Sequence, residues 1–129
     1  MRLLLDTHIW LWGLLEPERL QPVAAADLED PANELWLSPV SVWETLLLAE
    51  RGRLELDSPT ADWIERQLHR VPMRDAPLTR EVAFVSRSLD LGHQDPADRF
   101  IAATAVVYDL VLVTADDRLL QSDRYRVLT

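Results

Sequence analysis

Short apolar runs of strand length alternate along this chain with longer stretches that have the hydrophobic period of a helix. The runs of strand length lie at 2–5, 35–37, 111–113 and 126–128, with a weak candidate at 71–73. We expect helices at 7–15, 18–28, 40–51, 60–70 and 97–108, a further helix that follows Pro77-Leu78-Thr79 and ends near Leu89, and a short one at 115–120. Because parallel strands need helical crossovers, this alternation predicts an α/β fold with a mostly parallel sheet and helices on both of its faces.

Two of the expected helices have clear signals at their ends. Ser38 followed by Pro39 is typical of a helix start, and Gly52 is expected to end the same helix. Asp95 followed by Pro96 has the same layout before the helix at 97–108. No repeat, low-complexity segment or linker interrupts the sequence, so we expect one domain that spans residues 1–129.

The composition excludes several kinds of site. The chain has no cysteine, so it has neither disulfides nor thiolate metal ligands. All 13 basic residues are arginine, and the absence of lysine excludes Schiff-base chemistry and the Walker-type phosphate loop. The formal net charge of −9 counts against non-specific binding to phosphate backbones over the whole surface. A cluster of acids that binds a metal ion can nevertheless account for part of this negative net charge.

The sequence offers no segment for a membrane. Its longest apolar runs are far shorter than the roughly 20 residues needed to span a bilayer. Asp6 interrupts the first apolar run after three leucines, which is unlike a secretory signal peptide. We therefore expect a soluble, cytoplasmic protein with no membrane partner.

Acidic residues follow two of the expected strands. Asp6 comes directly after the run at 2–5, and Asp116 comes three residues after the run at 111–113. The carboxyl ends of the strands in an open α/β sheet are where sites form. If the two strands are neighbours, both carboxylates lie at the same edge of the sheet.

Two further acids lie on the inward faces of expected helices. Glu44 shares a stripe with Val40 and Leu47, where an unpartnered carboxylate is costly to bury. Asp98 shares a face with Ile101, in a helix whose alanines allow close packing on the sheet. Asp95 is better explained as the cap of that helix.

The four carboxylates Asp6, Glu44, Asp98 and Asp116 are therefore the candidate catalytic and metal-binding residues. Taken singly, the aspartates have an ordinary explanation, because negative charge is favoured at helix starts. In one crevice, however, four carboxylates repel one another and raise their pKa values, which a divalent cation relieves. With oxygen ligands only, Mg²⁺ is the expected cation and Mn²⁺ is possible.

We interpret the histidines and tryptophans as structural residues rather than as metal ligands. His8, His69 and His93 lack a paired spacing on one helix face, so we expect no ligand role for them and no zinc site. Trp12, Trp36 and Trp43 fall on core-like positions, whereas Trp10 and Trp63 are the better candidates for exposure.

Four blocks of the sequence occur in a specific order and spacing. They are LLLDTH at 3–8, SVWE at 41–44, HQDPADRFIAATA at 93–105 and LVTAD at 112–116. In these blocks the chain resembles the PIN-domain ribonucleases, and among them the VapC-type toxins of bacterial toxin–antitoxin pairs. The resemblance extends over essentially the whole chain. It implies a three-layer α/β/α sandwich, hydrolysis of RNA phosphodiester bonds, a homodimer and a cognate VapB-like antitoxin.

The resemblance also assigns roles to residues. Asp6 and Asp98 match the family's main metal ligands, and Glu44 and Asp116 match its supporting acids. Thr114 matches a hydroxyl beside the site, and Arg99 a position that often carries arginine. There are two departures from the family pattern.

One departure is Ala97, which stands where many relatives have a bulky aromatic residue. The other is the lack of the lysine that many relatives carry shortly after the glutamate. This second departure leaves RNA phosphate contacts to arginines such as Arg51, Arg53 and Arg99.

Three functions remain open at this point. The first is a Mg²⁺-dependent endoribonuclease toxin in which a metal-activated water attacks the phosphate. The second is a Mg²⁺ phosphohydrolase with Asp6 as nucleophile, although such enzymes normally use a lysine. The third is a non-catalytic metal-binding interaction module, whose acids only hold a structural cation.

Overall fold

The computed structural model describes residues 1–92 and 94–129, and at their centre lies a five-stranded sheet in the order β3-β2-β1-β4-β5. The strands are β1 (Arg2–Leu5), β2 (Glu34–Leu37), β3 (Arg74–Asp75), β4 (Val111–Val113) and β5 (Val127–Leu128). All four neighbouring pairs are parallel, with Leu4 of β1 opposite Trp36 of β2 and Leu112 of β4. The sheet of the described residues is therefore wholly parallel, where the sequence predicted a mostly parallel one.

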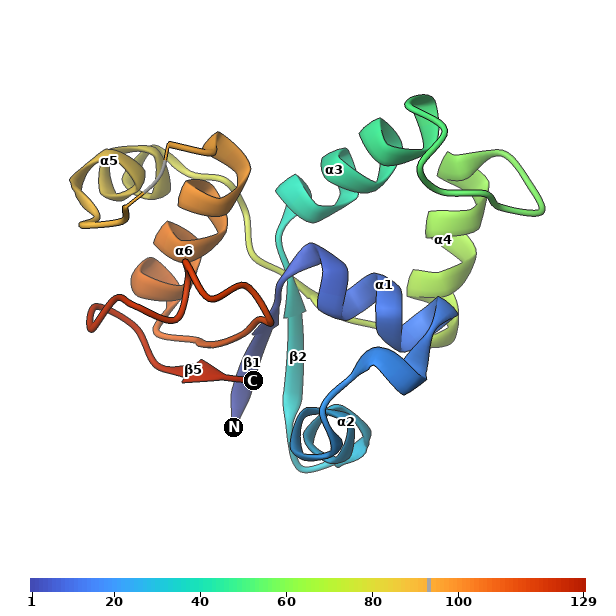
Figure 1. The fold of residues 1–129 in the computed structure, drawn as a ribbon, viewed down its shortest axis with the longest axis horizontal. Helices are drawn as coiled ribbons and strands as arrows, with labels where there is room; N and C mark the ends of the chain where they lie inside the picture. Colours follow the sequence, from blue (N-terminus) through green and yellow to red (C-terminus); the bar gives the residue numbers. More distant parts are fainter. Residues whose placement is uncertain (93) are drawn as a thin grey trace.

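Helices cover both faces of this sheet. They are α1 (Thr7–Leu15), α2 (Pro22–Glu29), α3 (Pro39–Glu50), α4 (Thr60–Arg70), α5 (Arg80–Ser88) and α6 (Pro96–Tyr108). Helices α5 and α6 lie on one side of the strands and α1, α2 and α4 on the other, while α3 lies above their ends (Figure 1). This arrangement confirms the predicted α/β/α sandwich.

The alternation of side chains along the strands divides the core in two. Leu4 and Leu112 face the helix pair α5 and α6, whereas Leu3, Leu5 and Val113 face the helices on the opposite side. All five are at most 2% exposed. Successive residues of a strand point to opposite faces, so a strand covered on both faces is apolar throughout. The short runs LLL and VLV are therefore the pattern expected for central parallel strands.

The ends of α3 and α6 agree with the signals in the sequence. The Ser38 hydroxyl caps α3 by accepting from the Val40 N–H, and the Asp95 carboxylate caps α6 by accepting from the Ala97 N–H at 3.0 Å. Gly52 follows α3 with a φ of +70°, a left-handed conformation that glycine adopts without a steric penalty. These caps fix where each helix begins, and hence where its first-turn side chains point.

Some local predictions were wrong. The stretch 115–120 forms turns rather than a helix, and the expected helix at 18–28 is divided into the 3₁₀ helix Pro17–Arg19 and α2. Pro22 causes this division because it starts a new helix and cannot continue the previous one. The strand expected at 71–73 lies instead at Arg74–Asp75.

The tryptophan predictions were partly reversed. Trp10 and Trp63 are 2% and 5% exposed, and their rings meet edge to face at 6.2 Å between α1 and α4. Trp43 is 54% exposed on α3, whereas Trp12 and Trp36 are partly buried. Within the described part of the chain, none of the helices has the length and apolar character that crossing a membrane requires.

Candidate active site

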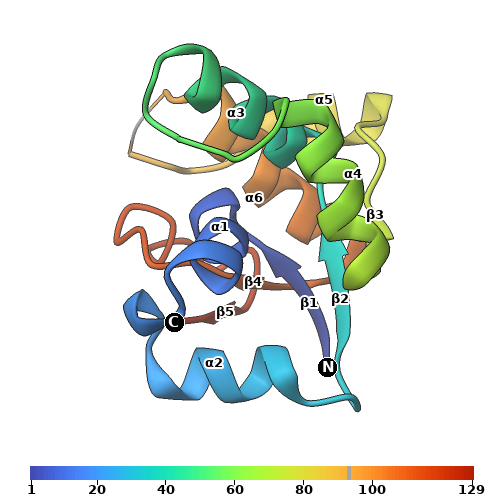
Figure 2. The same ribbon diagram turned by 90° about the vertical axis from the view of Figure 1, so that its right-hand side faces the viewer.

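An acidic cleft of about 410 Å³ opens at the carboxyl ends of β1 and β4. From β1 the chain continues to β2 on one side, and β4 pairs with β1 on the other, so the cleft lies at the switch point of the sheet. Figure 2 views the same strands after a quarter turn, with α3 and α6 above α1. The described residues that line the cleft are Asp6, His8, Trp12, Arg19, Glu44, Asp95, Asp98, Ala115, Asp116 and Arg118.

Asp6 lies at the floor of the cleft, between the end of β1 and the start of α1. It is 6% exposed, and each of its carboxylate oxygens accepts a hydrogen bond, from the Thr7 N–H and from the Thr114 hydroxyl, both at 2.8 Å. Burial raises the pKa of Asp6, and these two hydrogen bonds oppose that shift. Thr114 directly follows β4, and its hydroxyl, which the family resemblance placed beside the site, contacts Asp6.

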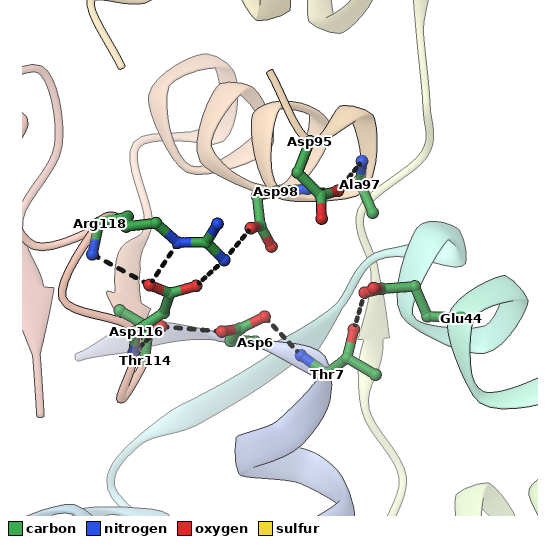
Figure 3. A network of polar contacts seen from close by, with 9 residues as sticks. All are labelled: Asp6, Thr7, Glu44, Asp95, Ala97, Asp98, Thr114, Asp116 and Arg118. Carbon is green, nitrogen blue, oxygen red and sulfur yellow. Dashed lines mark hydrogen bonds and ion pairs between the residues drawn. The ribbon is translucent and has the colours of Figure 1, made fainter. Parts of the chain in front are cut away.

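Asp98 points into the cleft from the first turn of α6 (Figure 3). It is 8% exposed. Burial first, and then the neighbouring charges of Asp95, Asp6, Asp116 and Glu44, raise the pKa of Asp98 to about 7. The cleft therefore carries more negative charge than its surroundings balance, as the sequence predicted for converging carboxylates.

Glu44 is held by Thr7, a contact that sequence reasoning missed. The Thr7 hydroxyl donates to a Glu44 carboxylate oxygen and lies 2.9 Å from the Ser41 hydroxyl. Burial raises the pKa of Glu44, the Thr7 hydrogen bond lowers it, and Asp6 and Asp95 raise it further. The half-buried Glu44 side chain is thus directed at the cleft rather than at the core. Its hydrogen-bond partner is the polar Thr7, whereas the sequence predicted apolar surroundings for it.

Asp116 is engaged by Arg118, a second residue that the sequence interpretation missed. One Asp116 oxygen accepts from the Arg118 backbone N–H at 3.0 Å and from its Nε at 3.1 Å, and the other accepts from Nη2 at 2.9 Å. The same Nη2 lies 3.4 Å from Asp98 Oδ2. The only signal in the sequence is an arginine two residues after an acid, which is too common to be informative.

Asp95 and Tyr125 complete the polar surroundings. Asp95 caps α6, as predicted, but also lines the cleft and contributes to the raised pKa of Asp98. Tyr125 is buried with its hydroxyl donating to the Leu119 carbonyl at 2.7 Å. Burial and then the charges of Asp98, Asp116 and Asp6 raise the pKa of Tyr125 to about 12, which keeps the phenol neutral.

Arg99 does not face the cleft, which contradicts its expected contact with RNA phosphates. It is buried, and its guanidinium donates to the carbonyls of Ser86 and Leu89, both at 2.8 Å, and of Leu91 at 3.5 Å. Arg99 lies one position after Asp98, and about 100° of helix rotation turns it toward α5. Its contacts tie the segment after α5 to α6.

Of the other residues singled out in the sequence, some line the cleft and others do not. His8 lines it, His69 lies in α4, and His93 falls outside the described residues. Arg53 lines an adjoining pocket together with Trp12 and Arg19, whereas Arg51 is exposed and lines neither.

The donor set suits Mg²⁺ or Mn²⁺, since it consists of carboxylate oxygens whose pKa values are raised, first by burial and then by the neighbouring carboxylates. In residues 1–92 and 94–129, however, no three acidic or histidine side chains are close enough to hold one metal ion as they stand. Two of the four predicted ligands, Asp98 and Asp116, are instead directed at Arg118. The residues therefore fit the cation chemically, provided that these side chains turn toward it.

Comparison with known proteins identifies relatives of this chain. The model of the PIN domain matches residues 3–125. Ribonuclease VapC22 of Mycobacterium tuberculosis is 38% identical over 117 residues, which are 90% of this chain and 88% of the relative.

Solved structures show the same fold. VapBC2 from Rickettsia felis bound to a promoter DNA fragment has a TM-score of 0.75 and 16% identity, covering 99% of this chain and 98% of the other. DNA-bound VapBC from Salmonella typhimurium has a TM-score of 0.73 and 17% identity, and the match covers 99% of this chain and 97% of the other. The extent of the family match and the identity to the VapC relative both exceed what chance similarity gives. The chain therefore belongs to the PIN-domain family and, within it, to the VapC-type group.

Proposed function

We propose that this protein is a Mg²⁺-dependent endoribonuclease and the toxin of a toxin–antitoxin pair. The observation that carries the proposal is the convergence of Asp6, Glu44, Asp98 and Asp116 on one cleft from four separate parts of the chain. Helix caps alone do not require such convergence. The 38% identity to a protein named as a ribonuclease supports RNA as the substrate.

The residues of the cleft have distinct tasks in this proposal. Asp6 and Asp98 are the main cation ligands, and Glu44 and Asp116 support them. A bound Mg²⁺ or Mn²⁺ supplies an activated water nucleophile and offsets the negative charge of the phosphate. Thr114 holds Asp6 in place through its hydroxyl, and Thr7 does the same for Glu44.

The phosphohydrolase alternative receives less support. In that mechanism Asp6 would attack a phosphate directly, yet both of its oxygens accept hydrogen bonds and its side chain lies at the floor of the cleft. The chain also has no lysine to accompany such a nucleophile. A purely structural cation site is the remaining alternative.

The decisive experiment is incubation of the purified protein with RNA, with Mg²⁺ and with EDTA. Cleavage that requires the cation supports the proposal. Release of phosphate from small esters without RNA cleavage selects the phosphohydrolase, and neither activity selects the non-catalytic module.

The partners are part of the same proposal. Similar solved structures are VapBC complexes, which supports a VapB-like antitoxin for this chain. We also propose a cytoplasmic location and a homodimer. Co-expression with a small protein encoded next to this chain, followed by light scattering of the purified complex, tests the antitoxin and the dimer together.

A further inference from the structure

Arg118 occupies the space between two of the carboxylates on the wall of the cleft. Its Nη2 lies 2.9 Å from Asp116 Oδ2 and 3.4 Å from Asp98 Oδ2, and its Nε lies 3.1 Å from Asp116 Oδ1. Figure 3 shows the guanidinium between these two acids, on the side of the cleft opposite Glu44. Both Asp116 oxygens are therefore bound to a cation that belongs to the chain itself.

Arg19 lines the same cleft, and within residues 1–92 and 94–129 its side chain makes no such contact with the acids of the cleft. Its guanidinium pairs with Glu16 at 3.1 Å and lies 4.3 Å from the centre of the Trp12 ring. It carries the same charge as Arg118 and contributes to the same cleft. A comparison of the two arginines can thus separate a direct contact from a general effect of positive charge.

We propose that Arg118 is an internal counter-ion that competes with the divalent cation for Asp98 and Asp116. This inference rests on the proposed function, since it concerns the same cation. The oxygens that the guanidinium binds are among those that a cation would need, so the two cannot bind them together. Binding of the cation therefore displaces Arg118 from the carboxylates.

The surroundings of Arg118 allow this displacement. Its side chain is 56% exposed, and the residue lies in the turn after Asp116 rather than in a helix or strand. The side chain can leave toward solvent without opening the core. The lack of three metal-spaced acids among residues 1–92 and 94–129 fits a cleft whose ligands are still held by the arginine.

The test compares Mn²⁺ affinity, measured by calorimetry and by electron paramagnetic resonance, in the wild type, Arg118→Gln and Arg19→Gln. We expect Arg118→Gln to bind Mn²⁺ about two- to fivefold more tightly, the upper part of the range that exposed ion pairs contribute to an equilibrium. Arg19→Gln removes the same charge from the same cleft and is expected to change the affinity by less than about twofold. Arg118→Lys keeps the charge but loses the forked contact, so its affinity should lie between the wild type and Arg118→Gln.

Thermal unfolding supplies a second readout that does not depend on activity. Without metal, Arg118→Gln should unfold at a lower temperature than the wild type, because the acids lose their counter-ion. Its gain in Tm on addition of saturating Mn²⁺ should be larger than that of the wild type.

The outcomes separate this inference from the proposed function. If the wild type binds Mn²⁺ and Arg118→Gln binds it equally or more weakly, or if both arginine variants gain equally, Arg118 is not a specific competitor. If the wild type binds no Mn²⁺ under any condition, the proposed cation dependence itself is wrong, and the competition is excluded with it.

Discussion

The acidic cleft and a neighbouring apolar hollow share two helices, α3 and α6. The hollow has a volume of about 360 Å³ and is lined by Pro39, Val40, Trp43, Leu78, Pro96, Ala97 and Phe100. Helix α3 contributes Glu44 to the cleft and Trp43 to the hollow, while α6 contributes Asp98 to the cleft and Ala97 to the hollow. Consecutive residues of one helix therefore line two different surfaces, the acidic cleft and the apolar hollow.

The geometry of the α-helix explains this division. Each residue is rotated by about 100° from the previous one, so Ala97, Asp98 and Arg99 point in three directions. Ala97 lines the hollow, Asp98 faces the cleft, and Arg99 binds carbonyls near α5. The hollow leaves apolar surface in contact with water, since Trp43 is 54% and Leu78 47% exposed, whereas the cleft retains uncompensated charge. The uncompensated charge of the cleft is therefore expected to lower the stability of the fold.

The largest expected effect is loss of RNA cleavage when Asp6 or Asp98, the proposed main ligands of the cation, is changed. Asp98→Asn and Asp6→Asn should each reduce kcat/KM at least about 10³-fold, which corresponds to roughly 4 kcal/mol of barrier, because the cation loses a charged ligand. Asp117→Asn is the matched control, since Asp117 is exposed and does not line the cleft. Cleavage by either ligand variant at near wild-type rates would contradict the site assignment.

Arg99 provides the largest expected effect on stability. Arg99→Met removes the donors to three carbonyls in a buried site and should lower the free energy of unfolding by about 2–4 kcal/mol. Urea unfolding measures the change. The control is Arg80→Met, at an exposed position of α5. An equally small loss in both variants would mean that the Arg99 contacts do not stabilise the fold.

The charge of the cleft predicts a pH dependence of the metal-free protein. The pKa of Asp98 is raised to about 7 from an ordinary value of 3.8. Between these values the folded state binds more protons at this group than the unfolded state, so stability falls as pH rises from about 4 to 7. Thermal unfolding in EDTA should show this fall. Asp98→Asn should make the profile flatter and raise Tm at pH 7 by several degrees. A wild-type Tm that rises over this range would contradict the raised pKa.

The smallest effect is expected at Trp43, the residue before Glu44. Trp43→Ser should change kcat/KM by less than about threefold because this side chain faces the hollow, whereas Glu44→Gln should lower it about 10- to 100-fold. Steady-state cleavage of one RNA substrate by both variants gives the comparison. Similar losses at both positions would show that the cleft and the hollow are not functionally separate.

The strands, most helices and the four acids could be predicted because their signals are local. Unbroken apolar runs such as LLL indicate buried parallel strands, and a residue directly after a strand, such as Asp6, lies at its carboxyl end whatever the remaining chain does. The position of Asp98 in the first turn of α6 follows from Asp95 and Pro96 alone. These conclusions require only the periodicity of the chain and the preferences of its caps.

The contacts around those acids were decided by tertiary structure. Thr7 meets Glu44 across 37 positions of the chain, and Thr114 meets Asp6 across 108. The burial of Trp10 and the opposite exposure of Trp43 depend on which helix packs against which. Local periodicity shows which side chains share a face, but it does not show what that face will contact. Local signals thus specified most of the helices and strands and the positions of the four acids along them. Which groups surround these acids depends on how distant segments of the chain pack together. The free energy of that packing is shared among residues far apart in the chain, so local sequence patterns do not reveal it.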